Sequence, residues 1–322
     1  MTALDAPSPA APAHPSAAQS SDALRAPPPL PDLSRAARSR PPTSPLALVR
    51  TLVTHRDLVW QMARREVVGR YRGSVLGLLW SFFHPLLMLA VYTFAFAYVM
   101  KASPRGGMMM GATQPAPGSR AGMFEYALLA FSGLILFNLF AEVMTRSPVC
   151  ILQSANYVKK VVFPLEILPF VYLVSGLIHA SMSLLVLVLG QLLIVHMVPW
   201  TAVFAPLAAV PLLIFILGAG WFLASLGVYL RDVGHIMGIV TMLVMWLAPV
   251  FYPLDMLKNP IILVALRLNP LTVPMESFRD LMLYGQCPNL LWLGGYTVVA
   301  CAVACGGFFF FQRTKRGFAD VL

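Results

Sequence analysis

The chain has 322 residues, of which 58% are hydrophobic and only 11% are charged, and its mean hydropathy is +0.75. This balance excludes an ordinary soluble globular protein and indicates an all-α protein that crosses a membrane several times. The net charge of +10 would also suit a nucleic-acid-binding protein. However, the basic residues lie between apolar segments, where anionic lipid and membrane topology explain them better.

The N-terminal residues 1–45 form a proline-rich segment that we expect to be disordered. They contain 11 of the 27 prolines, with alanine and serine between them, and this composition cannot bury a core. The segment also lacks the basic and apolar regions of a signal peptide. A solvated linker is favoured over a segment that docks on a partner. We expect a membrane domain over residues 46–316 and a short cytoplasmic tail at 317–322.

A basic, amphipathic stretch runs directly into the first apolar segment. Four arginines lie within the nine residues 64–72, separated by valines and a tyrosine. These charges cannot enter hydrocarbon, so the pattern predicts a helix that lies at the membrane surface. Residues 76–100 then carry no formal charge over 25 residues, which is long enough to cross a bilayer with some tilt. Gly73 and Gly77 permit a sharp change of direction between the two stretches.

One face of this first span is predicted to carry aromatic side chains. At 100° per residue, Trp80, Phe83, Phe94 and Tyr98 fall close together on the helix surface. Aromatic faces bind sugar rings without fixing one register, so this aromatic stripe would suit a sliding glycan. Ordinary helix packing is the alternative, and the sequence alone favours it.

Six membrane spans are predicted in all. They cover residues 76–100, 126–145, 165–195, 201–229, 233–252 and 290–311. With the N-terminus inside, the inner segments hold twelve lysines and arginines, and the outer segments hold six, Arg279 among them. This bias predicts that both termini lie in the cytoplasm.

The inner loop 147–162 has apolar residues at helical spacing. Ser147 is expected to cap a short helix there and Pro148 to occupy its first position. A simple surface helix and a helix that contacts a partner subunit fit this pattern equally well.

The outer loop 253–289 is unusually long and contains two apolar stretches, at 261–266 and 273–283. Each is too short to span a bilayer, so we expect two re-entrant or interfacial helices. A structural cap is the alternative.

Several kinds of chemistry have no matching motif in the sequence. There is no G-x-x-x-x-G-K-[ST] phosphate-binding loop, so the chain is not expected to hydrolyse nucleotide. The acidic residues, histidines and four cysteines show no spacing typical of a metal site or of acid–base catalysis. Glu142 and Glu166, near span ends, are expected to be hydrogen-bonded or hydrated, and the spans to lack the buried carboxylates of a proton relay.

Four motifs occur in order between residues 55 and 316. They are Arg64-Arg65-Glu66 with Gly69-Arg70-Tyr71-Arg72-Gly73-Ser74-Val75-Leu76-Gly77-Leu78-Leu79-Trp80 and His84-Pro85-Leu86; Ala155-Asn156-Tyr157-Val158-Lys159-Lys160-Val161-Val162-Phe163-Pro164; Tyr229-Leu230-Arg231-Asp232-Val233; and Asn269-Pro270-Leu271 with Phe278-Arg279. In this order they resemble the motifs of ABC-2 type permeases, most closely those that export lipid-linked polysaccharides.

The resemblance implies a homodimer of this chain bound to two copies of an ATPase subunit in a bacterial inner membrane. ATP and Mg²⁺ would be held by that partner, so this chain would need no cofactor and would not be an enzyme. The cargo would be O-antigen, with a capsular polysaccharide, a teichoic acid, or a drug or small lipid as alternatives. A membrane-embedded glycosyltransferase is a weaker reading, because the outer loop offers only Asp255, Glu276 and Asp280 as acids.

The resemblance also implies roles for particular residues. The surface that couples to the ATPase would comprise Arg64, Arg65, Glu66, Asn156, Tyr157, Lys159 and Lys160. The pyrophosphate headgroup of the lipid carrier would contact Arg70 and Arg72, because arginine forks match phosphate oxygens. Simple anchoring of these two arginines to lipid headgroups, or contact with a partner, is at least as good an explanation. For the aromatic stripe, the resemblance makes a role in a glycan path as well supported as a role in helix packing.

Overall fold

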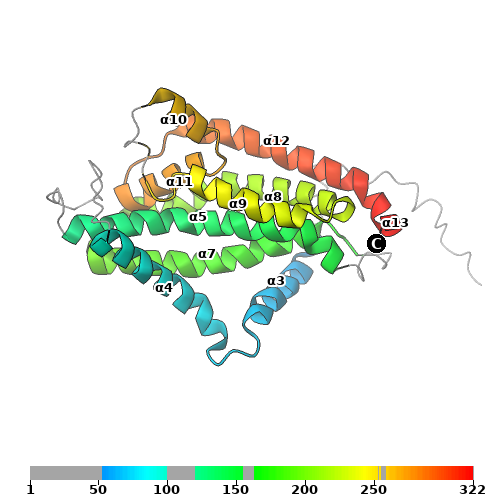
Figure 1. Cartoon of the computed structure of the whole chain (residues 1–322), viewed down its shortest axis with the longest axis horizontal. Coiled ribbons are helices and arrows are strands. Elements are labelled where there is room, and N and C mark those ends of the chain that lie inside the picture. Colours follow the sequence, from blue (N-terminus) through cyan, green and yellow to red (C-terminus); the bar gives the residue numbers. More distant parts are fainter. Residues whose placement is uncertain (1–52, 100–119, 155–162, 253, 255–258, 322) are drawn as a thin grey trace, which may run out of the picture. The chain divides into compact units, whose positions relative to one another are not determined.

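A computed structural model describes residues 53–99, 120–154, 163–252, 254 and 259–321. These residues form helices and connecting turns and contain no strand (Figure 1), which confirms the predicted all-α class. Residues 1–45 lie outside the described part of the chain. So does most of the predicted coupling surface, Asn156, Tyr157, Lys159 and Lys160.

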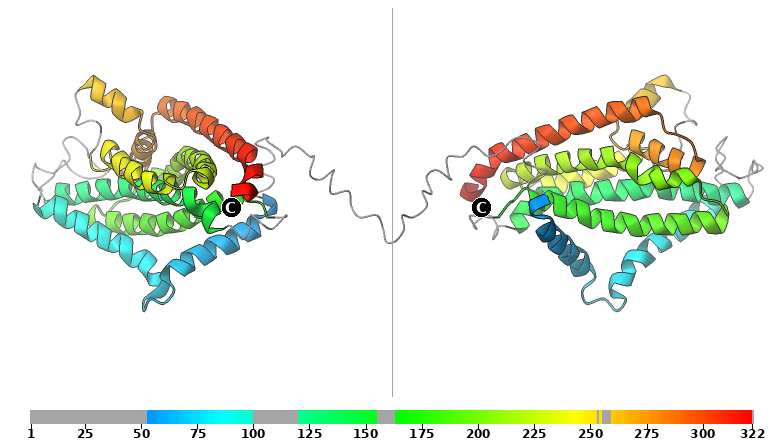
Figure 2. Two further views of the ribbon diagram at one scale, coloured as in Figure 1. Left: turned by 45° about the vertical axis from the view of Figure 1, so that its right-hand side comes forward. Right: turned by 180° about the vertical axis from the view of Figure 1, so that it is seen from behind.

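Four helices are long and apolar enough to cross a membrane. They are α5 (Arg120–Gln153), α7 (Ile167–Ile194), α8 (Ala205–Tyr229), which follows the turn η3 (Trp200–Phe204), and α12 (Leu290–Thr314). Figures 1 and 2 show them running side by side. Of the most apolar part of α5, 83% is buried inside the chain, against 17% for α12. Helix α5 is therefore the centre of the bundle, and α12 lies on its outside.

Two shorter apolar helices occupy the first and fifth predicted spans. They are α4 (Trp80–Thr93), which continues into the wider turn η2 (Phe94–Val99), and α9 (Val233–Leu247). By length and composition, the described residues contain four spans, or five if a bent pair of outer helices counts as one. The predicted total of six spans therefore stays a prediction.

Helices α3 (Arg56–Tyr71) and α4 form a V whose turn projects from the side of the bundle (Figures 1 and 2). The turn, which ends in η1 (Gly77–Leu79), has positive φ angles of 86° at Gly73 and 50° at Gly77. Such angles favour glycine, so the predicted hinge is confirmed. Along α3, Val59, Ala63 and Val67 are buried at four-residue spacing. Val59 and Ala63 join a hydrophobic cluster with the start of α7, while the predicted place of α3 at the membrane surface stays a prediction.

The expected helix start at Ser147 and Pro148 is wrong. Helix α5 runs through both residues without a break and ends at Gln153. Contact with α8 explains this, because a Cβ on Gly227 would come within 1.9 Å of the Pro148 carbonyl oxygen. Close packing against α8 thus holds the backbone in a helix where local sequence alone favours a new start.

The outer loop forms two short helices, as predicted. They are α10 (Pro260–Arg267) and α11 (Thr272–Arg279), and α11 continues into the turn η5 (Asp280–Tyr284). The side chain of Asn259 caps α10 by accepting a hydrogen bond from the Ile261 amide at 3.0 Å. The two helices are bent by 95° relative to each other. Whether they re-enter the membrane stays a prediction.

The count of loop charges assigns Arg279 to the outer loop. In the structure, however, its side chain is not solvated. Its side chain is buried, with a residual exposure of 2%. It donates hydrogen bonds to the carbonyl oxygens of Pro249 at 2.7 Å, Val250 at 2.6 Å and Leu129 at 3.2 Å, and to Ser132 Oγ at 3.3 Å. Arg279 therefore fastens α11 to the middle of the bundle.

The last described residues form a short turn, η6 (Lys315–Gly317), and α13 (Phe318–Val321). Phe318 is fully buried, and its ring lies 5.7 Å from that of Phe311. Phe318 of the predicted C-terminal tail thus packs against α12, whereas Asp320 and Val321 are exposed.

Candidate functional site

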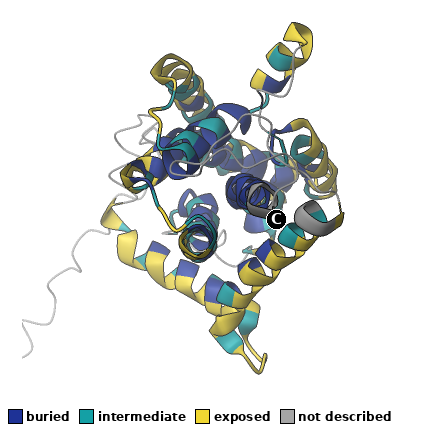
Figure 3. Cartoon of the chain, turned by 90° about the vertical axis from the view of Figure 1, so that its left-hand side faces the viewer, coloured by how far each residue is buried: buried dark blue, intermediate teal, exposed yellow. Residues whose placement is uncertain are grey.

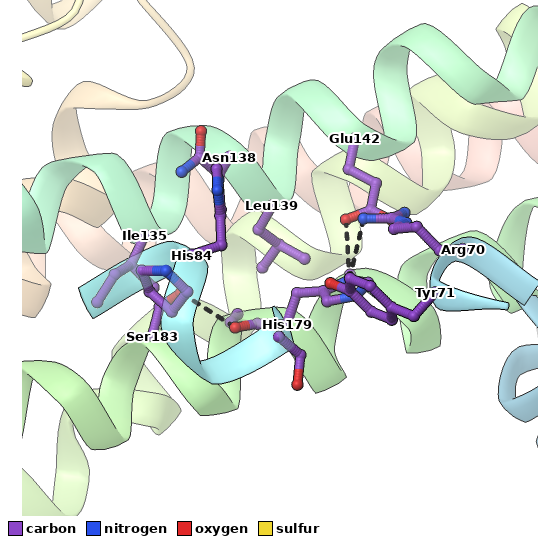
Figure 4. A pocket seen from close by; sticks show the side chains of 13 residues that line it. Arg70, Tyr71, His84, Ile135, Asn138, Leu139, Glu142, His179 and Ser183 are labelled. Carbon is purple, nitrogen blue, oxygen red and sulfur yellow. Dashed lines mark hydrogen bonds and ion pairs between the residues drawn. The ribbon is translucent and has the colours of Figure 1, made fainter. Parts of the chain in front are cut away.

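A cavity of about 220 Å³ lies where the V meets the bundle (Figure 4). It is enclosed by the end of α3, the start of α4, and the middle of α5 and α7. Its lining residues are Arg70, Tyr71, Ser81, His84, Pro85, Ile135, Asn138, Leu139, Glu142, Gly176, His179, Ala180 and Ser183. Polar and titratable groups are costly inside an apolar bundle, so their convergence here marks a candidate functional site.

The charged centre of the cavity is an ion pair between Arg70 on α3 and Glu142 on α5. The Glu142 side chain is only 12% exposed. Its second oxygen, Oε2, lies 3.4 Å from His179 Nδ1, and Ser175 Oγ donates to Oε1 at 3.5 Å. A largely buried carboxylate requires such partners, and those of Glu142 come from both neighbouring helices.

His179 Nδ1 also lies 3.4 Å from NH1 of Arg70. A ring nitrogen can accept a hydrogen bond from Arg70 or donate one to Glu142, but it cannot do both at once. The other ring nitrogen, Nε2, is buried and has no hydrogen-bond partner among the described residues. His179 therefore lies between Arg70 and Glu142 and can form a hydrogen bond with either of them.

Tyr71 closes the α3 side of the cavity. Its ring meets that of His179 edge to face, with centroids 6.1 Å apart. Burial raises the pKa of the Tyr71 phenol above its ordinary value, which further favours the protonated hydroxyl.

A second ion pair joins the same two helices outside the cavity. Arg146 on α5 pairs with Glu66 on α3, and both side chains are about one third exposed, at 33% and 35%. The Arg146 guanidinium also lies over the ring of Tyr172, 5.6 Å from its centroid. The contact between α3 and α5 therefore has two charged attachments.

Glu142 and Glu166, which are expected from the sequence to be hydrogen-bonded or hydrated, both have hydrogen-bonding partners. Glu142 has the partners given above, and Glu166 pairs with Lys315 Nζ at 2.6 Å. The expectation that the spans lack buried carboxylates is wrong: Glu166, at the start of the third predicted span, is buried, and Glu142, in the second predicted span, is only 12% exposed and lies beside a histidine. The contact joins residues 37 positions apart, so only the fold reveals it.

The predicted arginines lie in different surroundings. Arg70 lines the cavity, whereas Arg72 is exposed in the turn and does not line it. Arg64 and Arg65 are exposed on α3, and Glu66 beside them pairs with Arg146. The structure therefore brings Arg70 to a site with partners that the sequence does not indicate, His179 above all. A histidine within an apolar span is the one signal that could have found it.

The aromatic stripe faces away from the core of its own chain. Trp80, Phe83 and Phe94 are 37%, 38% and 62% exposed, whereas α4 buries Ser81, Pro85 and Leu89. Figure 3 shows the contrast between exposed and buried faces among the helices. This chain therefore covers the three described aromatic side chains only in part; the side chain of Tyr98 lies outside the described part.

Comparison with known proteins identifies a matching family and several similar proteins. Residues 57–283 match the family model described as ABC-2 type transporter. The chain is 28% identical over 277 residues to the O-antigen export system permease protein RfbA of Myxococcus xanthus; the match covers 85% of this chain and 99% of that protein. It is 26% identical over 271 residues to a protein of the same name from Klebsiella pneumoniae, covering 83% and 95%.

Proposed function

Because the chain belongs to the ABC-2 type transporter family, we propose that it is the membrane subunit of an ATP-driven exporter of lipid-linked polysaccharide, most specifically O-antigen. The observation that carries this proposal is the match to O-antigen export permeases, which covers 85% of this chain and 99% of one relative. The family places the chain in a membrane beside an ABC ATPase subunit. This chain is then a transport subunit and not an enzyme, and ATP and Mg²⁺ bind to the ATPase.

The proposed assembly is a homodimer with two ATPase subunits in the bacterial inner membrane. Each copy contributes six spans, which are the four long helices together with α4–η2 and α9. Both termini lie in the cytoplasm, as the bias in loop charges predicts. Helix α3 and residues 155–162 then face the ATPase, with Arg64, Arg65, Glu66, Asn156, Tyr157, Lys159 and Lys160 as the contact surface.

The proposed cargo path begins at the cavity. Arg70 lines the cavity and Arg72 is exposed in the turn beside it, which supports a role for both guanidinium groups in binding the pyrophosphate of a lipid carrier. The exposed stripe formed by Trp80, Phe83 and Phe94, with Tyr98 beyond, then offers stacking surfaces for the glycan. Closure of the ATPase subunits moves α3, and this movement admits the headgroup to the bundle.

Deletion of the gene for this chain tests the proposal. We expect surface O-antigen to disappear and lipid-linked glycan to accumulate on the cytoplasmic side of the membrane, with both effects reversed by the intact gene. Persistence of surface O-antigen would contradict the proposed cargo. Loss of the lipid-linked glycan itself would instead indicate a role in synthesis, as for a glycosyltransferase.

A further inference from the structure

The two ion pairs between α3 and α5 are arranged with opposite polarity. Helix α3 carries Glu66 and Arg70, and α5 carries Glu142 and Arg146. Residues four apart lie on the same face of a helix, one turn from each other. The acid of each helix therefore meets the base of the other at two successive levels, and these two pairs fix the register of α3 on α5.

The two pairs differ in their surroundings. The Glu66–Arg146 pair lies outside the cavity, and both of its side chains are about one third exposed. The Arg70–Glu142 pair lines the cavity, and Glu142 is the more buried partner. Among the residues that the structure describes, a third group, His179, lies within 3.4 Å of both the guanidinium and the carboxylate of the inner pair alone.

We propose that Glu142 is an internal substitute for an anionic ligand on Arg70, and that a diphosphate group entering the cavity displaces it. This inference rests on the proposed function, which brings a diphosphate to Arg70. In the exchange, Arg70 turns its N–H donors from the carboxylate to phosphate oxygens. His179, in the tautomer that carries a proton on Nδ1, keeps its hydrogen bond to Glu142 Oε2, so the largely buried carboxylate retains a partner. The Glu66–Arg146 pair meanwhile keeps α3 attached.

A resident carboxylate also gives the site selectivity. Without it, Arg70 would offer an open guanidinium to any anionic lipid, including phospholipids with a single negative charge. With Glu142 in place, a ligand gains only the difference between its own interaction with Arg70 and that of the carboxylate. A diphosphate, with more charge and more acceptor oxygens, satisfies this condition better than a phosphodiester.

The test uses the full chain in lipid nanodiscs and the isosteric variant Glu142→Gln. Its probes are a polyprenyl diphosphate, inorganic pyrophosphate and phosphatidylglycerol, and dissociation constants are measured for each. Because a charge-assisted competitor is removed, Glu142→Gln should bind the polyprenyl diphosphate about tenfold more tightly. Its preference for diphosphate over phosphatidylglycerol should fall. Binding of inorganic pyrophosphate would show that the diphosphate group alone suffices, whereas binding of the lipid alone would assign part of the recognition to its chain.

Glu66→Gln is the matched control, because it makes the same chemical change in the pair outside the cavity. Because Glu66 pairs with Arg146 and does not compete for Arg70, this variant should not bind the diphosphate more tightly than the unaltered chain does. Equal effects of the two variants, or weaker binding by Glu142→Gln, would overturn the exchange. Should Glu142→Gln fail to fold, His179→Leu provides a second test. It removes the ring nitrogen that donates a hydrogen bond to the displaced Glu142, so it should weaken diphosphate binding several-fold. Unchanged binding by that variant would also contradict the exchange.

The same measurements separate this inference from the proposed function. If the unaltered chain binds the diphosphate and Arg70→Gln does not, the headgroup site stands, whatever Glu142→Gln does. If neither the unaltered chain nor any variant binds a diphosphate, the headgroup site itself is wrong, and the exchange falls with it.

Discussion

Gly133 is a residue whose missing side chain allows Arg279 to reach its partners. A Cβ at this position would lie 2.6 Å from NH2 of Arg279 and 2.8 Å from the carbonyl oxygen of Val250. Those two atoms are hydrogen-bonded to each other at 2.6 Å. The bond between the outer helix α11 and the segment after α9 therefore depends on the surface of a third helix, α5.

Gly133→Ala should accordingly destabilise the protein although Arg279 is unchanged. The added methyl group must push apart a buried hydrogen bond, which costs about 1–3 kcal/mol. Thermal unfolding in detergent should show a lower midpoint. Gly238→Ala is the control, because the Cβ that it adds to α9 meets no atom within 4 Å. Equal midpoints for the two variants would mean that the Arg279 contacts do not contribute to stability.

Helices α8 and α12 approach each other closely at a pair of glycines. A Cβ on Gly307 of α12 would come within 2.0 Å of the carbonyl oxygen of Gly218 on α8. Since that neighbour is backbone, the two helices would have to separate. Small residues that allow such an approach are typical of helix contacts in membranes, where dispersion rather than water drives association.

Gly307→Ala should therefore lower the yield of the folded protein in the membrane, with a cost of about 1–3 kcal/mol or more. The neighbouring Gly306→Ala makes the same change on a side of α12 with no atom within 4 Å, so its yield should be normal. Gel filtration of fluorescently tagged protein compares the two. Normal yield for both variants would contradict the tight contact of α8 and α12.

For the aromatic stripe of α4 and η2, in contrast, we expect substitutions to leave the yield of protein in the membrane unchanged. Because Phe94 is 62% exposed, the double variant Phe94→Ala/Tyr98→Ala should keep normal membrane abundance and reduce glycan export. Phe311→Ala is the contrast, since this ring is fully buried and its loss should cost about 3–5 kcal/mol and lower abundance. Full export by the double variant at normal abundance would exclude these rings from the glycan path.

Some of these elements could be predicted from the sequence, and others could not. Apolar length indicates the four long helices, and glycine indicates the hinge at Gly73 and Gly77, because both signals are local. The continuation of α5 through Pro148 depends on its contact with α8, and Arg279 is buried by carbonyl groups from α5 and from the segment after α9. Such contacts join residues far apart in the chain, so no local pattern contains them.

The candidate site was predictable to the same extent. The arginine cluster before the first span drew attention to Arg70, and its chemistry suggested an anion. Its pairing with Glu142 joins residues 72 positions apart, and the contact with His179 joins residues 109 positions apart. The sequence therefore suggests an anionic ligand for Arg70, which stays a prediction, but it does not indicate the groups that contact Arg70 in the structure.

For the whole molecule, the loop charges predict that both termini lie in the cytoplasm. A cysteine introduced next to Leu322 should therefore remain unlabelled by an impermeant thiol reagent in intact cells and should react once the cells are opened. The native Cys287, Cys301 and Cys305 are exposed on the chain and should be replaced by serine first. Labelling in intact cells would overturn the proposed topology.

The reversed polarity of the two ion pairs has an electrical consequence for the molecule in an energised membrane. A transmembrane voltage does work on displaced net charge, about 2.3 kcal/mol per unit charge at 100 mV. Each level of the α3–α5 contact holds one positive and one negative charge, and α3 itself contributes one of each, Arg70 and Glu66. When α3 moves as a body, the work done on these two charges cancels. The membrane potential therefore exerts no net force on α3 through its paired charges.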